Sequence, residues 1–171
     1  MGGRESAAPV SFTVKETAPG VQIVEFMIEG GVIRPEQLPE VRLPEVDTTK
    51  TVVLSGRGPH WLYAYMVHEI HFCRRLCTYE PRLGCGIIVE SPSREELGRG
   101  VDLRTGELKE VSLGARGQLQ LELKETRSGL QVVEIKILGD RFIEPGEMAL
   151  VPWGELKARV DPTRPVVMFG L

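Results

Sequence analysis

The chain has 171 residues, 42% of them hydrophobic and 26% charged, as in an ordinary globular domain. A formal net charge of −3 argues against a broad basic surface for DNA, but leaves room for one basic pocket that binds a phosphate-bearing ligand. No stretch approaches the ~20 apolar residues that span a bilayer, and the start lacks the apolar core of a signal peptide. Three cysteines, an odd number, suit a reducing compartment, so we expect a cytoplasmic protein without DNA or membrane partners.

The sequence pattern of the first 55 residues predicts mainly β-strands. Alternating apolar residues over Val10–Glu16 and Val21–Met27, separated by a Pro-Gly turn, predict a β-hairpin. The prolines in residues 28–50 allow at most a short helix, near 35–41. Residues 51–55 are a β-branched run that is typical of a buried strand.

One main helix is predicted to begin just after Pro59, which suits its first turn, and to end near Cys77. Its apolar stripe is Leu62, Met66, Ile70, Cys73 and Cys77, and a second face carries Ala64, His68, His71 and Arg75. Residues 76–79 and 85–90 also have strand patterns, joined by a turn at 80–84, and residues 92–118 suit a loop or weak strands.

The C-terminal third repeats part of the N-terminal pattern. Lys15–Glu25 returns as Lys124–Glu134, and Asp47–Val53 returns as Asp161–Val167. The repeated order favours a partial duplication over a chance likeness of two strand patterns. We therefore expect an α/β fold with a β-rich domain over 1–105, a linker at 106–118 and a structural partial duplicate over 119–171.

The segment Ser55-Gly-Arg-Gly-Pro59 connects the predicted buried strand to the helix. Backbone amides in such a loop, with the positive end of the helix, form an anion site that Arg57 can reinforce. Gly56 and Gly58 would let the backbone approach a ligand closely. The loop matches no standard phosphate-binding fingerprint, so an ordinary tight turn is an equal alternative.

Two further pairs carry groups that phosphate chemistry uses. His68 and His71 share a helix face, where they can bind a metal or exchange protons. Glu80 and Arg82 flank a proline, where a carboxylate can hold a divalent metal and a guanidinium can stabilise phosphate charge. The structural alternatives are solvated histidines and a surface ion pair.

Two other groups have more common structural uses. The cysteines lack the Cys-x2-Cys spacing of a zinc knuckle, so buried and inert thiols are favoured over metal ligands. Trp61, Tyr63 and Tyr65 can stack on bases, although aromatic side chains more often pack in the core.

Two of these segments together resemble a known family. Ser55-Gly-Arg-Gly-Pro-His-Trp-Leu62, followed by the helix with His71, and Tyr79-Glu-Pro-Arg-Leu-Gly84 resemble the small CRISPR-associated ring nucleases. These are manganese-dependent enzymes that accompany type III CRISPR systems. The likeness covers roughly residues 10–105. It implies a Rossmann-like core, similar to the sensor domains that bind cyclic oligoadenylates.

The resemblance implies a metal-dependent phosphodiesterase that degrades cyclic tetra-adenylate and so switches off antiviral signalling. It gives catalytic roles to His71, Glu80 and Arg82, with manganese held by His71 and Glu80, and it implies a homodimer that can stack with others around one ligand. The expected ligand contacts are Ser55, Gly56, Arg57, Gly58, Pro59, His60, Trp61 and His68.

One residue departs from the family pattern. Where the family typically has Asp-Pro-Arg, this chain has Glu80-Pro81-Arg82. A displacement of ~1 Å in a catalytic group can cost about 100-fold in rate. This departure keeps open a non-catalytic sensor of the same ring. An exoribonuclease that trims 3′ adenylates from RNA is another alternative, since the same site could accept linear oligoadenylate.

Overall fold

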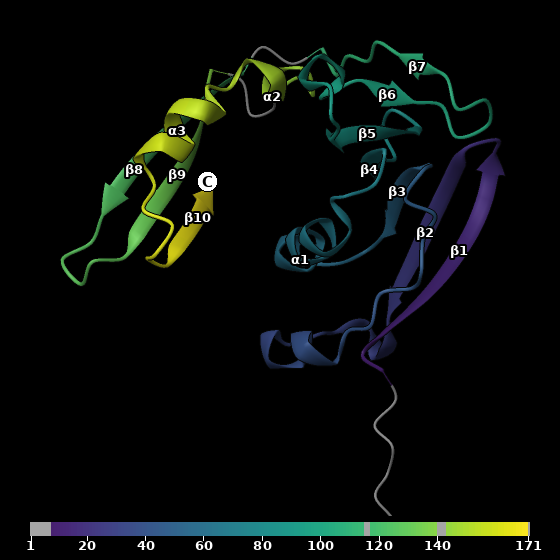
Figure 1. Cartoon of the computed structure of the whole chain (residues 1–171), viewed down its shortest axis with the longest axis horizontal. Helices are drawn as coiled ribbons and strands as arrows, with labels where there is room; N and C mark the ends of the chain where they lie inside the picture. The colour runs from purple at the N-terminus through teal and green to yellow at the C-terminus, as the bar shows by residue number, and fades with distance from the viewer. Residues whose placement is uncertain (1–7, 115–116, 140–142, 171) are drawn as a thin grey trace, which may run out of the picture. The chain divides into compact units, whose positions relative to one another are not determined.

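The computed structural model describes residues 8–114, 117–139 and 143–170 (Figure 1). These residues divide into two compact units, with the boundary between Glu110 and Val111. No helix in these ranges is long and apolar enough to cross a membrane. Each unit contains its own sheet, so each is described by itself.

The first unit is built on a mixed sheet whose strand order follows the chain, from β1 to β7 among the described residues. Its strands are β1 (Val10–Ala18), β2 (Val21–Ile28), β3 (Thr51–Gly56), β4 (Arg75–Glu80), β5 (Cys85–Glu90), β6 (Gly100–Val101) and β7 (Leu108–Lys109). One α-helix, α1 (His60–Ile70), and the 3₁₀ turns η1 (Glu29–Gly31), η2 (Pro35–Glu40) and η3 (Arg94–Glu96) complete the unit.

Most of the predicted strands are confirmed. β1 and β2 form the expected antiparallel hairpin, in which Gly20 takes the positive φ of 78° that the turn requires. β2, β3 and β4 are parallel, and β5 returns antiparallel to β4. The short helix expected near 35–41 is the 3₁₀ turn η2. β7 extends the sheet into the segment expected to be a linker, because Leu108 packs against the buried residues of one sheet face.

The main helix is shorter than predicted, because α1 ends at Ile70 and not near Cys77. Its buried stripe is Leu62, Met66 and Ile70, as expected. After the helix, the Arg74 amide donates to the Thr48 carbonyl at 2.8 Å and the chain enters β4. Cys77 is therefore a buried strand residue paired with Val53, and Arg75 belongs to β4 and not to the histidine face.

Two apolar clusters cover the two faces of this sheet. On one face, α1 and the 33–46 segment pack on the alternate residues Val24, Phe26, Val52 and Leu54. On the other face, Val53, Cys77 and Ile88 pack with residues of the 97–108 segment. The described strands follow one another without the reversal of order that opens a crevice in doubly wound folds, so the Rossmann-like core stays an expectation.

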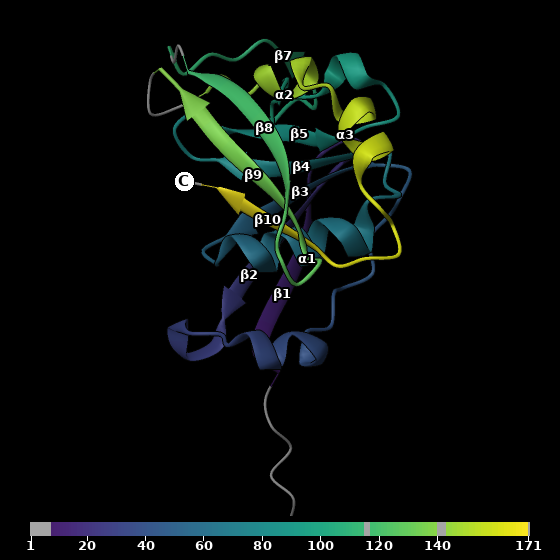
Figure 2. The same cartoon turned by 90° about the vertical axis from the view of Figure 1, so that its left-hand side faces the viewer.

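The second unit contains a three-stranded sheet among the described residues. β8 (Gln118–Glu125) and β9 (Gln131–Leu138) are antiparallel, and β10 (Val166–Gly170) lies parallel to β9. Two short helices, α2 (Glu147–Leu150) and α3 (Trp153–Arg159), lie in the connection between β9 and β10. Figure 2 shows β9 between β8 and β10.

Details of the first unit recur in the second. A lysine on the first hairpin strand pairs with a glutamate on the second strand in both units: Lys15 with Glu25, and Lys124 with Glu134. A glutamine side chain also accepts the backbone amide of an aspartate at 2.8 Å in both: Gln22 from Asp47, and Gln131 from Asp161. The strand connections are likewise the same, antiparallel and then parallel.

Candidate functional site

The loop Gly56–Pro59 and the turn Glu80–Gly84 lie side by side at one edge of the first-unit sheet. β3 and β4 are parallel neighbours, with Leu54 opposite Thr78, so both strands end at this edge. We call this side of the sheet, where the parallel strands β3 and β4 have their carboxyl ends, the carboxyl edge; the term does not refer to an outer strand. The sequence predicted both segments, and the parallel pairing of their strands brings them together about 5 Å apart.

The loop is anchored from the helix. Tyr63 on the first turns of α1 donates its hydroxyl to the Gly56 carbonyl at 2.8 Å, and its ring meets Phe26 edge-on at 5.2 Å. Burial raises the pKa of Tyr63, and the hydrogen bond to Gly56 opposes that rise. Tyr63 is therefore a support of the loop, as the core-packing alternative predicted.

The two glycines of the loop have a packing role. A Cβ added to Gly56 would lie 2.5 Å from the Phe26 carbonyl oxygen, and one on Gly58 would lie 3.0 Å from the Phe26 ring. Both glycines are thus required by the approach of β2. The close contact with Phe26 therefore accounts for both glycines, and no bound ligand is needed to explain them.

The charged and polar side chains around the loop point to solvent at this edge. Arg57 and His60 are exposed, while Ser55 and Trp61 are half-buried. α1 begins at His60, and no side chain caps its first turn among the described residues. The edge therefore presents the first backbone amides of α1 beside the exposed guanidinium of Arg57, which has no hydrogen-bond partner among the described residues, and this combination favours an anion.

The turn after β4 holds a tight carboxylate–guanidinium pair. Arg82 donates Nε to one oxygen of Glu80 at 2.8 Å and Nη2 to the other oxygen at 3.0 Å. The Leu83 and Gly84 amides close the turn on the Glu80 carbonyl. The side-chain hydrogen bond from Arg82 lowers the pKa of Glu80, and the same bond raises the pKa of Arg82.

His68 and His71 lie at the opposite edge, where β3 and β4 begin. His71 follows the last residue of α1 and donates Nδ1–H to the His68 carbonyl at 2.5 Å, because a carbonyl can only accept. This bond leaves Nε2 of a neutral His71 ring as the acceptor. The two histidine rings stack at 5.9 Å, and both side chains are exposed.

The structure therefore does not bring His71 together with Glu80 and Arg82 in one chain. α1 runs back along the strands, so its 11 residues span about 16 Å between the two edges. β4 spans a similar length, about 17 Å, in the other direction. His68 is likewise separated from the loop residues that were expected to share its ligand.

One chain does not offer a manganese site. No group of three or more histidine, cysteine, aspartate or glutamate side chains in the described ranges converges on a point that could hold a metal. His71 and Glu80, the two expected ligands, lie at opposite edges. The donor set of a single chain thus does not fit the expected ion.

The cysteines are structural. Cys73, Cys77 and Cys85 are free and buried, as the sequence favoured. Burial raises the pKa of Cys77 to about 12 and raises the pKa of the other two thiols. None of them has the thiolate character that metal binding or nucleophilic attack requires.

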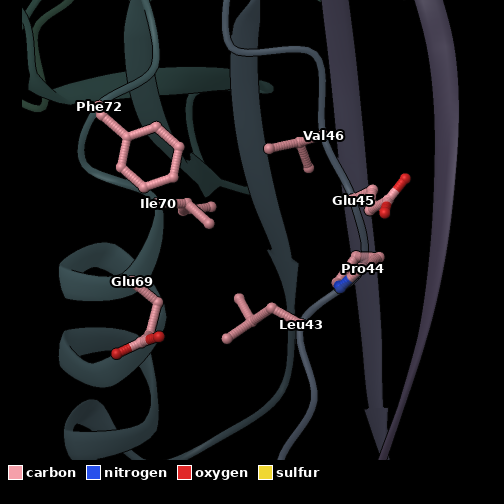
Figure 3. A pocket seen from close by; sticks show the side chains of 7 residues that line it. All are labelled: Leu43, Pro44, Glu45, Val46, Glu69, Ile70 and Phe72. Carbon is pink, nitrogen blue, oxygen red and sulfur yellow. The ribbon is translucent and has the colours of Figure 1, made fainter.

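A groove of about 400 Å³ lies next to His71, and no motif in the sequence predicted it. Figure 3 shows Ile70 and Phe72 on one side and Leu43 and Val46 on the other, with the Glu69 carboxylate at the helix side. Phe72 is 61% exposed, and its ring meets that of His71 edge-on at 5.7 Å. An aromatic residue next to the predicted histidine was the only signal for this groove.

The similarity to known proteins lies in the first unit, the part of the chain that contains this candidate site. A family model described as "CRISPR-associated protein (Cas_csx3)" matches residues 26–102, which include both edges but none of the second unit. An uncharacterized protein of Aquifex aeolicus (strain VF5) is 33% identical over 88 residues, which are 49% of this chain and 78% of that relative. The chain belongs to the Cas_csx3 family of CRISPR-associated proteins.

Proposed function

We propose that the protein is a ring nuclease, a phosphodiesterase that opens cyclic tetra-adenylate and so ends type III CRISPR signalling. The observation that carries the proposal is the carboxyl edge, where the Gly56–Pro59 loop, the start of α1 and the Glu80–Arg82 turn meet. Arg57 and Arg82 are exposed there in a chain with a net negative charge. Membership in a CRISPR-associated family supports a defence-related phosphate ligand.

The active site of this proposal is shared between two copies. His71 lies at one edge of the sheet and Arg82 at the other, about 16 Å apart along α1. Two copies stacked head to tail would bring the His71 edge of one against the Arg82 edge of the next. In such a site, Arg82 and the loop amides hold the phosphate, while Nε2 of the second copy's His71 accepts or returns a proton.

The groove beside His71 suits an adenine in this arrangement. A flat base would lie between Phe72 and Ile70 on one side and Leu43 and Val46 on the other. The Glu69 carboxylate can accept from the exocyclic amino group. The groove would then hold a base of the same ring whose phosphate lies on the carboxyl edge of the neighbouring copy.

Manganese enters this proposal through the family resemblance. Glu80 of one copy and His71 of another would be its protein ligands, an oxygen and a nitrogen donor of the types that this ion accepts. Nε2 of His71 has one lone pair, so metal binding is the alternative to the proton transfer described above. The ion would supply a Lewis acid for the phosphate. Because one chain lacks the complete donor set, metal dependence should appear only under conditions that allow stacking.

The test is single-turnover cleavage of cyclic tetra-adenylate, with protein in excess and with or without Mn²⁺. We expect linear adenylate products that require Mn²⁺, and a loss of about 100-fold or more for His71→Ala and for Arg82→Ala. Arg104→Ala is the matched control, since Arg104 is exposed in the same unit and makes no salt bridge among the described residues. Absence of any linear product from wild type would reject the proposal.

A non-catalytic sensor is the second candidate, and the Glu80–Arg82 pair favours it. A carboxylate that is occupied by its own arginine is less available to a metal. Binding of the ring without turnover, also for Glu80→Asp, would support the sensor. An exoribonuclease acting on 3′ adenylates would instead cleave linear oligoadenylate faster than the ring.

We infer that the second unit is a partial duplicate of the first with no site of its own. The recurring ion pair, the glutamine–aspartate contact and the strand connections support this inference. The described residues of the second unit contain no counterpart of α1, of the histidines or of the Glu-Pro-Arg turn.

A further inference from the structure

β10 has the composition of a central strand and the position of an edge strand. Its counterpart in the first unit, β3, is fully covered, with Val52, Val53 and Leu54 at 0% exposure. In β10, Val166 and Val167 are 42% and 43% exposed, Met168 is 63% exposed and Phe169 is 48% exposed. β3 lies between two strands, and both faces of its sheet are covered there, whereas β10 pairs with β9 alone in the described part of the chain.

The outer side of β10 lacks the devices that protect free edges. Edge strands usually carry charges, prolines or bulges that prevent pairing with another chain. Residues 166–170 contain no charged side chain and no proline. The opposite edge of the same sheet, β8, exposes Gln118, Gln120, Glu122 and Lys124 and is protected in the usual way.

An apolar groove continues from this edge onto one face of the sheet. It lies between α3 and the strands and is lined by Val133, Trp153, Leu156, Val160, Val166 and Met168. In the first unit, α1 packs on the corresponding face of β3, whereas the groove leaves Val166 and Met168 of β10 accessible among the described residues. The edge and the groove thus form one continuous apolar surface.

We propose that this surface is a self-association site, where β10 of one chain pairs antiparallel with β10 of a second copy. A two-fold axis at Met168 sets Met168 opposite its own symmetry mate. Val167 then lies opposite Phe169 of the second copy, and Val166 lies opposite Gly170. The three-stranded sheets become one six-stranded sheet, with three strands from each chain.

A second copy fits this edge in charge and in shape. Because β10 is uncharged, two copies meet without like charges opposite each other, and the Val–Phe pairs are of a favourable cross-strand type. The four exposed side chains would bury on the order of 300 Å² per copy. That is less than the roughly 600 Å² per partner of a small stable interface, so we expect a weak, reversible dimer with micromolar affinity.

The first test is disulfide trapping in the full-length chain. In the proposed register the Met168 Cα atoms lie about 5 Å apart, within the range that a disulfide spans. Met168→Cys should form a covalent dimer under mild oxidation at least ten times faster than the control Leu138→Cys. Leu138 is 47% exposed on the neighbouring strand, and the three native thiols are buried. Equal rates for the two variants would overturn the proposal.

The second test is sedimentation velocity over a concentration series without nucleotide. Wild type should dimerise in the micromolar range, and Met168→Lys should raise the dissociation constant at least tenfold by placing two ammonium groups together. Leu138→Lys should leave that constant unchanged. A wild-type monomer at 100-fold the expected constant, or a dimer that survives Met168→Lys, would overturn the proposal. This result is independent of nuclease activity, because His71 and Arg82 lie in the first unit.

Discussion

Arg82 folds back on Glu80 and occupies both carboxylate oxygens, at 2.8 Å and 3.0 Å. The Arg82 backbone amide adds a third bond to the same carboxylate at 3.0 Å. The Arg82 side chain is 55% exposed, so this pair is screened by water and contributes little to stability. The consequence is functional: each of the two groups proposed for phosphate chemistry is held by the other. A phosphate that binds Arg82 through Nε and Nη2, the two nitrogens that now hold Glu80, must displace this carboxylate.

Glu80→Gln should separate binding from turnover. The neutral amide releases Arg82, so we expect the dissociation constant for cyclic tetra-adenylate to fall about threefold, since exposed pairs are worth up to about 1 kcal/mol. Turnover should fall at least 100-fold, because the carboxylate is lost. Isothermal titration and single-turnover cleavage measure the two effects. Glu95→Gln changes the net charge equally at an exposed position and should alter neither; weaker binding by Glu80→Gln would contradict the competition.

Mixing two inactive variants should restore activity. His71→Ala keeps an intact Arg82 edge, and Arg82→Ala keeps an intact His71 edge. If the site forms between stacked copies, an equal mixture should regain about one quarter of the wild-type rate, because one contact in four joins the two intact edges. Cleavage assays on the mixture and on each variant provide the measurement.

The control for the mixture is a chain that carries both substitutions. His71→Ala/Arg82→Ala mixed with Arg82→Ala offers no intact Arg82 edge and should stay inactive. A His71→Ala and Arg82→Ala mixture that is no more active than the sum of its parts would place the whole site in one chain.

Local sequence pattern was sufficient for the strands and for the carboxyl edge. Alternation in Val10–Glu16 and Val21–Met27 predicts the hairpin because the side-chain period of a strand is two. The Gly56–Pro59 loop and the Glu80 turn each follow an apolar run. Once those runs form parallel neighbours, their ends must meet, so this half of the site follows from the sequence.

The end of α1 could not be predicted in the same way. Cys73 and Cys77 continue the helical spacing of Ile70, yet Leu76 and Cys77 fit a buried strand equally well. The choice depends on Val52 and Val53, which offer β4 a buried partner 24 residues away in the chain. The separation of His71 from Arg82 follows from the same β3–α1–β4 connection and cannot be predicted from the spacing of the motifs in the sequence.

Gly56→Ala should destabilise the first unit. The new Cβ would meet the Phe26 carbonyl oxygen at 2.5 Å, and backbone cannot retreat as a flexible side chain can. Overpacking of this kind costs about 1–3 kcal/mol in the free energy of unfolding. Chemical denaturation measures it. Gly154→Ala, where nothing lies within 4 Å of the added carbon, should be neutral or slightly stabilising. An unfolding free energy unchanged by Gly56→Ala would show that β2 and β3 separate easily.

The native thiols should resist modification. Burial raises the pKa of Cys77 to about 12, so almost no thiolate exists at pH 8. We expect a thiol-specific reagent to label none of Cys73, Cys77 and Cys85 in the folded protein, and all three after denaturation. Mass spectrometry counts the adducts. Rapid labelling of the native chain would mean that the strands carrying these residues open frequently.

Glu96 should make stability depend on pH in the acid range. Its carboxylate receives the Arg75 guanidinium at 2.5 Å and the Ser91 hydroxyl at 2.7 Å, and the Arg75 bond is the main reason that its pKa falls from 4.5 to about 2. Both side chains are under 20% exposed, at 18% for Arg75 and 19% for Glu96. The pair therefore contributes on the order of 2 kcal/mol to the free energy of unfolding at neutral pH.

The sign follows from the lowered pKa. The contribution of Glu96 is complete above its unfolded pKa of 4.5 and is lost as the pH falls toward about 2. Glu96→Gln should lower the unfolding free energy at pH 7 by on the order of 2 kcal/mol and should flatten its dependence between pH 5 and pH 2. Urea titrations at several pH values measure both effects. Glu95→Gln, next to it and exposed, should follow wild type; a Glu96→Gln curve parallel to that of wild type would assign the acid sensitivity to another carboxylate.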